Sequence, residues 1–120
     1  MVIKATHEHA QLIEKLALTI WHEHYTPLIG EEQVEYMLKN FQNAEVIKQQ
    51  IISQEYEYFI AFAKNNSTQL AVGYCSVKWG AKEQSIFLSK LYISAQYRKM
   101  GFSKKLLNTV FSKYPIYKYI

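Results

Sequence analysis

One short basic segment of the sequence has the residue types that bind a phosphate group. Arg98 is the single arginine of the chain, and Lys99, Gly101, Lys104 and Lys105 follow it closely. Arginine offers a fork of N–H donors to phosphate oxygens, lysine adds positive charge, and glycine lets the backbone approach a ligand closely. The segment therefore predicts a site for a phosphate or a pyrophosphate.

The basic segment also precedes a helical pattern. Hydrophobic residues recur behind it at helical spacing and predict a buried stripe: Leu106, Leu107, Val110, Phe111 and Tyr114. The first turn of a helix has unpaired N–H groups and the positive end of the helix dipole, which favour an anion. A basic turn before a helix is also common on ordinary solvated surfaces, so the residues alone leave both interpretations open.

Charge is distributed unevenly along the chain. Residues 1–60 contain nine glutamates and four lysines, whereas residues 61–120 contain nine lysines, one arginine and one glutamate. This polarity predicts that the second half meets an anion and that the first half attracts a cation. Two ordinarily solvated faces are the alternative. Nucleic-acid binding by the basic half is disfavoured, because its lysines are scattered and no nucleic-acid motif accompanies them.

Composition argues against several other kinds of site. The chain has no aspartate, which disfavours calcium loops and magnesium phosphotransfer sites. Cys75 is the single cysteine, expected as a buried strand residue, so no intrachain disulfide can form. The His-Glu-His triplets at 7–9 and 22–24 would point their histidines to different sides of a helix, so we expect no metal site.

Without a membrane-spanning run or a signal-peptide pattern, we expect a cytoplasmic protein with no membrane partner.

Hydrophobic periodicity predicts the elements that position the basic segment, beginning with a strand at 2–5 and an N-cap at Thr6. The first helical stripe comprises His9, Leu12, Ile13, Leu16, Ala17, Ile20 and Trp21. Pro27 and Gly30 are expected to end that helix. The next two helices are predicted from Val34, Met37, Leu38 and Phe41, and from Ile47 and Ile51 within 44–52.

The second half of the chain is predicted to form strands. These are residues 56–63, 70–79 and 85–94, joined at 65–67 and 80–84, with a last strand at 116–120 after the helix that Pro115 stops. Three successive strands without intervening helices favour an antiparallel meander. We therefore expect one α+β domain covering residues 1–120, with the element order β-α-α-α-β-β-β-α-β.

The run from Leu91 to Leu107 resembles the acetyl-coenzyme A binding motif of the GNAT (GCN5-related) N-acetyltransferase superfamily. In that motif a strand leads into an Arg/Gln-x-x-Gly-x-Gly/Ala turn and then a helix with paired leucines. Arg98 and Gly101 match, and Ser103 stands where Gly or Ala is usual. The element order also resembles that family, and the first helices together with residues 74–78 look like members that acetylate small amines, including polyamines.

The resemblance implies a GNAT-like, mostly antiparallel sheet flanked by helices, lacking the family's final helix and strands. It implies direct transfer of acetyl from acetyl-CoA to a primary amine of a small cationic molecule, without a metal. Backbone groups on the fourth strand would hold the pantetheine arm, and the turn would hold the pyrophosphate. The implied cofactor-binding residues are Leu91, Tyr92, Ile93, Arg98, Lys99, Met100, Gly101, Phe102, Ser103 and Lys104.

The catalytic groups are less clearly marked. Phe87, Leu88 and Ser89 occupy the region where some relatives have a glutamate base. Candidates for the general base are His22, Glu23 and Glu35. The alternative for each is an ordinary polar residue exposed on the surface, without a role in catalysis.

Tyr117 and Tyr119 precede the usual position of the tyrosine that often acts as the general acid in this family.

The alternative function is a non-catalytic GNAT remnant that binds coenzyme A or acts as a regulatory module. The uncovered sheet edge of a shortened domain predicts a homodimer or a strand-exchanged assembly.

Overall fold

The computed structural model describes residues 1–79, 85–114 and 118–119. Its elements, in chain order, are β1 (Val2–Lys4), η1 (His7–His9), α1 (Ala10–Ile29), α2 (Glu31–Phe41), α3 (Ala44–Ile52), β2 (Tyr56–Asn65), β3 (Thr68–Trp79), β4 (Ser85–Ile93), η2 (Ala95–Tyr97), α4 (Phe102–Lys113) and β5 (Lys118–Tyr119). The predicted order of helices and strands is confirmed. The predicted connection at 80–84 and residues 115–117 and 120 lie outside the described residues.

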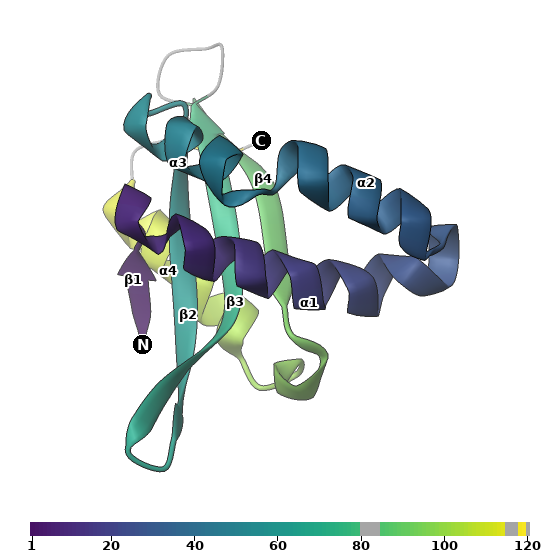
Figure 1. Ribbon diagram of the computed structural model, residues 1–120. Coiled ribbons are helices and arrows are strands. Elements are labelled where there is room, and N and C mark those ends of the chain that lie inside the picture. Colours follow the sequence, from purple (N-terminus) through teal and green to yellow (C-terminus); the bar gives the residue numbers. More distant parts are fainter. Residues whose placement is uncertain (80–84, 115–117, 120) are drawn as a thin grey trace.

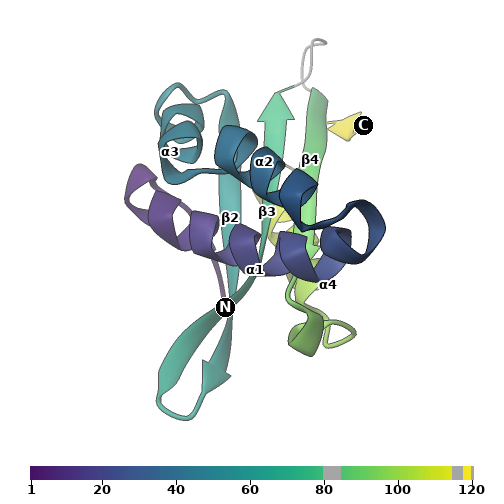
Figure 2. The same cartoon turned by 45° about the vertical axis from the view of Figure 1, so that its right-hand side comes forward.

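A sheet with helices on both faces forms the molecule (Figures 1 and 2). The strand order is β1-β2-β3-β4-β5, with antiparallel pairing throughout except for the parallel pair of β4 and β5. Helices α1, α2 and α3 cover one face, and α4 covers the other. The α+β prediction, with a mostly antiparallel sheet flanked by helices, is therefore confirmed.

The first helical stripe is largely confirmed by burial. The buried residues of α1 are Ala10, Ile13, Leu16, Ala17, Ile20 and Trp21. Thr6 caps the short η1 helix, and its side chain accepts a hydrogen bond from the Glu8 N–H. The expectation that Pro27 ends the helix is wrong, because α1 continues to Ile29. A proline removes only one backbone hydrogen bond so close to a helix end, and Gly30, with φ of 90°, makes the turn.

Two predicted core residues are exposed instead. Phe41 is 56% exposed at the end of α2, and Phe111 is 43% exposed on α4. The buried positions of these helices are Val34 and Leu38 on α2, and Phe102, Leu106 and Val110 on α4. Both exposed phenylalanines lie at the margin of a helical stripe, where spacing alone does not tell whether a neighbouring element covers the side chain.

The strand β4 contains a bulge. The register with β3 shifts between Ser76 and Val77, so that Ser89 of β4 has no partner opposite it. Leu88 and Leu91 consequently both pack in the cluster beneath α4, although residues three apart in a regular strand face opposite sides. The bulge thus exchanges the two faces of the strand for every residue that follows it.

A chain of buried hydrogen bonds links the helices to the sheet. Trp21 Nε1 donates to the Tyr74 hydroxyl at 3.1 Å, and that hydroxyl donates to Gln42 Oε1 at 2.7 Å. Gln42 Nε2 donates to the Tyr58 hydroxyl at 3.2 Å, which in turn donates to Gln50 Oε1 at 2.7 Å. Burial raises the pKa of Tyr58 to about 12, so its hydroxyl stays protonated and able to donate. The chain fixes α1, the end of α2 and α3 on the sheet.

A second polar cluster anchors the end of α4. The Glu57 carboxylate accepts from Lys4 Nζ at 2.7 Å, from Lys113 Nζ at 3.4 Å and from the Tyr114 hydroxyl. Burial opposes the charge on Glu57, but the hydrogen bonds from Lys4 and Tyr114 outweigh it and lower the pKa of Glu57. Since these partners come from β1, β2 and the end of α4, the cluster sets the direction in which α4 crosses the sheet.

Replacing Gln42 with leucine should lower the free energy of unfolding by about 2 kcal/mol, because the Tyr74 O–H would lose its buried acceptor. Chemical denaturation in urea would measure the change. Gln49→Leu is the matched control, since the Gln49 side chain donates to Glu45 on the exposed surface of α3, and the change should alter stability by less than about 0.5 kcal/mol. Equal stability of the two variants would show that the buried chain contributes nothing.

Candidate active site

The predicted phosphate-binding segment lies between the end of β4 and the start of α4. Two residues of this turn have left-handed backbone angles: Lys99 with φ of 65° and Gly101 with φ of 87°. Gly101 is the N-cap of α4, and a Cβ added there would meet no atom within 4 Å. The glycine is therefore required by the backbone conformation and leaves the surface beside the helix end open.

Several backbone N–H groups of this turn are available to a ligand. The first hydrogen bond of α4 joins the Lys105 N–H to the Gly101 carbonyl at 3.1 Å, and no side chain caps the helix. Within the described residues the N–H groups of Phe102, Ser103 and Lys104 therefore lack acceptors. Together with the positive end of the helix dipole, these three donors form a setting suited to an anion.

The side chains around the turn divide into anchors and exposed charges. Phe102 is buried and packs edge-on against Tyr97, so it holds the turn to the core. Arg98 Nε donates to the Ile93 carbonyl at 3.1 Å, which bends the exposed arginine back over the end of β4. Lys99 and Lys104 are exposed. Met100 is 59% exposed and has no polar group to bind phosphate.

The end of β4 presents an edge that other strands leave open. β5 pairs only with Ser85 and Ile86, so within the described residues no strand pairs with β4 from Phe87 onward on the side away from β3. Because of the bulge, Leu91 and Ile93 pack in the cluster beneath α4, whereas Tyr92 packs beneath α1. The backbone of 91–93 is thus held from both faces while its outer edge is uncovered.

Gly73 of β3 lies directly opposite Ile93. A Cβ at this position would come within 2.5 Å of Ile93 Cδ1 and 2.7 Å of the Tyr92 carbonyl oxygen. Real side chains do not approach a backbone oxygen so closely, so the two strands can have this spacing only with glycine at 73. The position of the β4 edge therefore depends on a residue that sequence reasoning did not single out.

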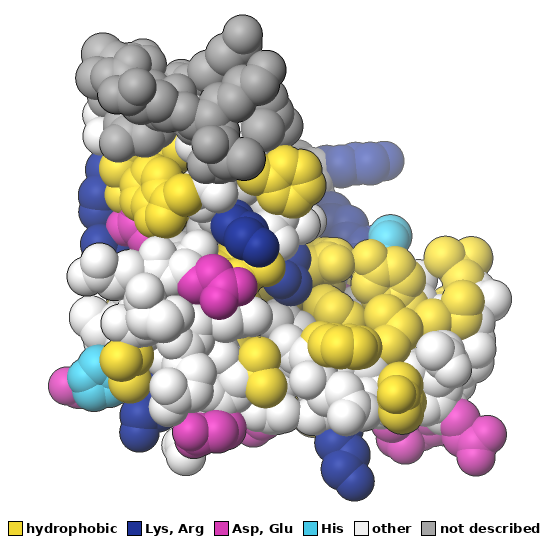
Figure 3. All heavy atoms as spheres, turned by 90° about the horizontal axis from the view of Figure 1, so that it is seen from above, with side chains coloured by type: hydrophobic (Ala, Val, Ile, Leu, Met, Phe, Trp, Pro, Cys, Tyr) yellow, Lys and Arg dark blue, Asp and Glu magenta, His cyan; other side chains and the backbone are white. Residues whose placement is uncertain are grey.

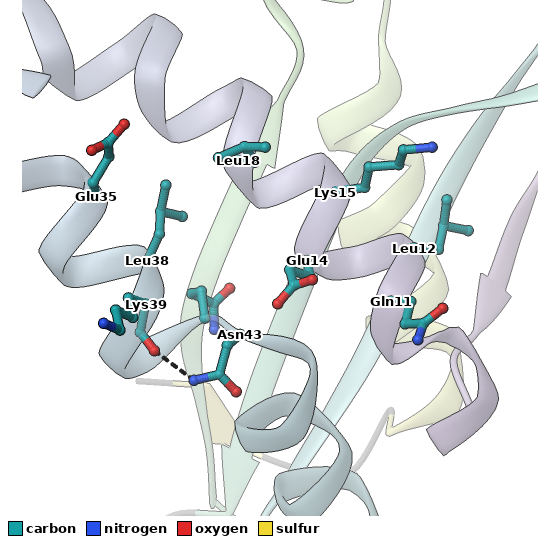
Figure 4. A pocket seen from close by; sticks show the side chains of 10 residues that line it. Gln11, Leu12, Glu14, Lys15, Leu18, Glu35, Leu38, Lys39 and Asn43 are labelled. Atoms are coloured by element: carbon teal, nitrogen blue, oxygen red, sulfur yellow. Dashed lines mark hydrogen bonds between the residues drawn. The ribbon is translucent and has the colours of Figure 1, made fainter.

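Two of the three predicted base candidates, His22 and Glu23, are consecutive residues of α1, and the third, Glu35, is on α2. Glu23 Oε1 accepts from the Ala95 N–H at 3.0 Å, so this carboxylate joins α1 to the segment that follows β4. A ring nitrogen of His22, Nδ1, lies 2.9 Å from the Thr26 hydroxyl on the same helix. Glu35 lies elsewhere, on the wall of a groove between α1 and α2 (Figure 4).

That groove between α1 and α2 has a volume of about 820 Å³. Its lining residues are Gln11, Leu12, Glu14, Lys15, Leu18, Glu35, Leu38, Lys39, Gln42 and Asn43. Glu14 is already engaged, because its Oε2 accepts from the Ala44 N–H at 2.7 Å. None of the lining residues belongs to β4 or to the turn before α4, so the groove is separate from the candidate cofactor site.

An aromatic cluster on the α1 side of β4 was not predicted. The Tyr25 and Tyr92 hydroxyls are 3.0 Å apart, and the Trp21 ring packs against both rings with centroid distances of 5.6 Å. Burial and the hydrogen bond with Tyr25 raise the pKa of Tyr92 well above its usual value. The spacing of Trp21 and Tyr25 on one helix is the signal that could have placed them on one face.

Beyond this cluster, exposed apolar side chains continue on the far ends of the helices. Leu28 is 72% exposed, Ile29 47% and Tyr36 59%. Seen from above, hydrophobic side chains gather where α2 and the end of α1 project past the sheet (Figure 3). In Figure 1 the connection between α1 and α2 lies on the β4 side of the sheet, away from β1.

The described residues show no cluster of three or more His, Cys or Glu side chains that could hold a metal ion. No helix in this part of the chain has the length and apolar character needed to cross a membrane.

Cys75 is fully buried in β3, as expected, and burial raises the pKa of its thiol to about 12. A thiol in this state is mostly protonated at neutral pH and is a poor nucleophile.

A sequence profile of the acetyltransferase (GNAT) domain matches residues 25–118. The chain belongs to the GNAT acetyltransferase family. The match includes the β4 edge, the turn with Arg98 and Gly101, and α4. A search of curated proteins gave no match.

Solved structures show the same fold at low sequence identity. The PaiA N-acetyltransferase of Thermoplasma acidophilum, solved with coenzyme A, has a TM-score of 0.81 and 23% identity over 96% of this chain and 71% of its own. A GNAT acetyltransferase of Staphylococcus aureus has a TM-score of 0.66 and 19% identity over 96% of this chain and 66% of its own. An aminoglycoside acetyltransferase from a soil metagenome, solved with sisomicin, has a TM-score of 0.70 and 12% identity over 100% of this chain and 74% of its own.

The contact between Glu23 and Ala95 gives a test that separates a structural role from a catalytic one. Glu23→Gln keeps an oxygen acceptor and should leave stability and acetyl transfer close to those of the unmodified protein. Glu23→Ala removes the acceptor and should cost about 1 kcal/mol of unfolding free energy. Both variants would be compared by thermal unfolding and by thiol release from acetyl-CoA. Loss of transfer in a stable Glu23→Gln protein would instead identify Glu23 as the base.

Proposed function

We propose that this GNAT domain transfers the acetyl group of acetyl-CoA to a primary amine of a small cationic molecule. The observation that carries the proposal is the turn before α4, where unpaired N–H groups of Phe102, Ser103 and Lys104 adjoin Gly101 and exposed basic side chains. Family membership supplies the class of reaction.

In this proposal the two ends of coenzyme A contact different parts of the chain. The N–H groups from Lys99 to Lys104 bind the pyrophosphate, and Arg98 adds positive charge beside them. The pantetheine arm lies along the open edge of β4 at Leu91, Tyr92 and Ile93 and bonds to their backbone groups. The thioester then lies near the bulge at Ser89, where a backbone N–H can polarise its carbonyl oxygen.

The chemical step in the proposal is a direct attack. The neutral amine nitrogen bonds to the thioester carbonyl carbon, the C–S bond breaks, and the coenzyme leaves as a thiolate that takes up a proton. Water or a nearby side chain accepts the proton that the amine loses. The acidic first half of the chain supports attraction of a cationic acceptor, through the exposed carboxylates of Glu31, Glu32 and Glu35 on α2.

Coenzyme binding and transfer are tested together with Gly101→Glu. The carboxylate would repel the pyrophosphate, and the β-carbon would strain a backbone with φ of 87°. At about a hundred times its dissociation constant, acetyl-CoA should stabilise the unmodified protein by roughly 2.7 kcal/mol and raise its unfolding temperature. Gly101→Glu should lose both this shift and thiol release with a panel of amines.

A matched control for this test is Gly30→Glu, because Gly30 also has φ of 90° but lies between α1 and α2, away from the turn. It should keep the shift caused by acetyl-CoA. If the coenzyme stabilises the protein but no amine is acetylated, the chain is a coenzyme-binding module without transfer activity. If the coenzyme stabilises neither protein, the site assignment is wrong.

We also propose that two copies of this chain associate through the side of the sheet near β5. Phe87 of β4 is 47% exposed and directly follows Ser85 and Ile86, the residues of β4 that pair with the two described residues of β5. Apolar side chains at an open sheet edge favour association.

Light scattering after gel filtration should give the mass of a dimer, and Phe87→Lys should shift the protein to a monomer. Tyr36→Lys, which changes an exposed aromatic residue on α2, is the control and should leave the dimer intact. A monodisperse monomer of the unmodified protein at micromolar concentration would contradict the proposal.

A further inference from the structure

Two lysines from neighbouring strands converge on one aromatic ring. Lys90 Nζ of β4 lies 5.1 Å from the centroid of the Tyr56 ring, and Lys78 Nζ of β3 lies 5.4 Å from the same centroid. Burial and the like charge of Lys78 lower the pKa of Lys90. The face between the sheet and the helices thus holds two positive charges close together, and lysines lie among hydrophobic side chains on this side of the molecule (Figure 3).

Lys90 has no carboxylate partner among the described residues. Its Nζ donates to the Ser89 hydroxyl at 3.4 Å, which is a long hydrogen bond to a neutral group. The nearby Glu55 carboxylate lies 3.9 Å from Lys78 Nζ and is exposed to solvent. A half-buried ammonium group without a counter-ion keeps two donors for an anion that arrives from outside the chain.

A buried hydroxyl without a partner lies on the same face. Ser76 is fully buried, and its Oγ makes no hydrogen bond. Ser76 and Lys90 are directly opposite each other in the register of β3 and β4, so their side chains share one face of the sheet. Leaving such a hydroxyl unpaired is unfavourable, and an anion oxygen beside Lys90 would provide a partner.

We propose that Lys90, Lys78 and Ser76 form a binding site for a carboxylate group. Two ammonium groups and one hydroxyl supply donors for the two oxygens of a carboxylate. The site is lined on its third side by the Tyr56 ring, and the exposed Glu55 carboxylate pairs with Lys78 at its solvent side, so Lys90 is the ammonium group without a carboxylate partner among the described residues.

The location of this site indicates where the carboxylate comes from. Lys90 immediately follows the bulge at Ser89 and precedes the part of β4 that is proposed to hold the pantetheine arm. A carboxylate bound here belongs to the acetyl acceptor, which is then an amine that also carries an acidic group. This assignment of the source rests on the proposed function, whereas the carboxylate site itself does not.

Acetate is the probe for the site alone. Sodium acetate should raise the unfolding temperature of the protein relative to sodium chloride at equal ionic strength, and Lys90→Met should abolish that rise. Lys64→Met removes an exposed lysine at the far end of β2, and this control variant should still show the rise in unfolding temperature with acetate. Ser76→Ala should raise the unfolding temperature without acetate, since it removes the unpaired hydroxyl, and should reduce the effect of acetate. No rise with the unmodified protein, or an equal rise with Lys90→Met, overturns the proposal.

The amino acid lysine and cadaverine identify the source of the carboxylate, because these amines differ by that group alone. With acetyl-CoA, kcat/KM should be about tenfold higher for the amino acid, the effect of one charged hydrogen bond. Lys90→Met should remove this preference and leave cadaverine unchanged. Equal rates for both amines overturn the assignment to the acceptor, and an acetate effect through Lys90 then assigns the site to a free carboxylate. An acetate effect without transfer to any amine upholds the site and refutes the proposed function.

Discussion

The bulge at Ser89 is the constraint on which the rest of the site depends. One extra residue in β4 reverses the faces of the strand, so that Tyr92 packs under α1 while Leu91 and Ile93 pack toward α4. A regular strand would place these side chains on the opposite faces and lose both sets of contacts. The open edge of β4 is therefore held rigidly by side chains, although no strand pairs with it within the described residues.

The helices on the two faces of the sheet contribute in different ways. On one face the hydrogen bonds from Trp21 through Tyr74 and Gln42 fix α1 and α2. On the other, Glu57 and its basic partners fix the end of α4, which determines where the beginning of that helix points. Both systems lie away from the turn at Gly101, and together they hold the helices on the two faces of the sheet.

Periodicity and turn residues were enough to predict the elements, because the patterns of α1 and the strand meander follow local rules. The basic turn could be located from Arg98 and Gly101 for the same reason. Contacts between distant segments could not be predicted: Glu23 bonds to Ala95, and Glu35 lies in a separate groove, although both looked equally suitable as bases. The bulge and the role of Gly73 depend on the pairing of two strands, which a single sequence does not record.

Gly73 and Gly101 differ in what limits their replacement by a larger residue. Space around Gly101 is open, so a larger residue there meets only the backbone strain of a positive φ. At Gly73 any side chain would collide with the backbone of β4. A substitution in the turn is therefore limited by backbone strain and by the bound ligand, and not by a neighbouring segment of the chain. Changing position 73 requires the two strands to separate, and so it would alter the cofactor edge.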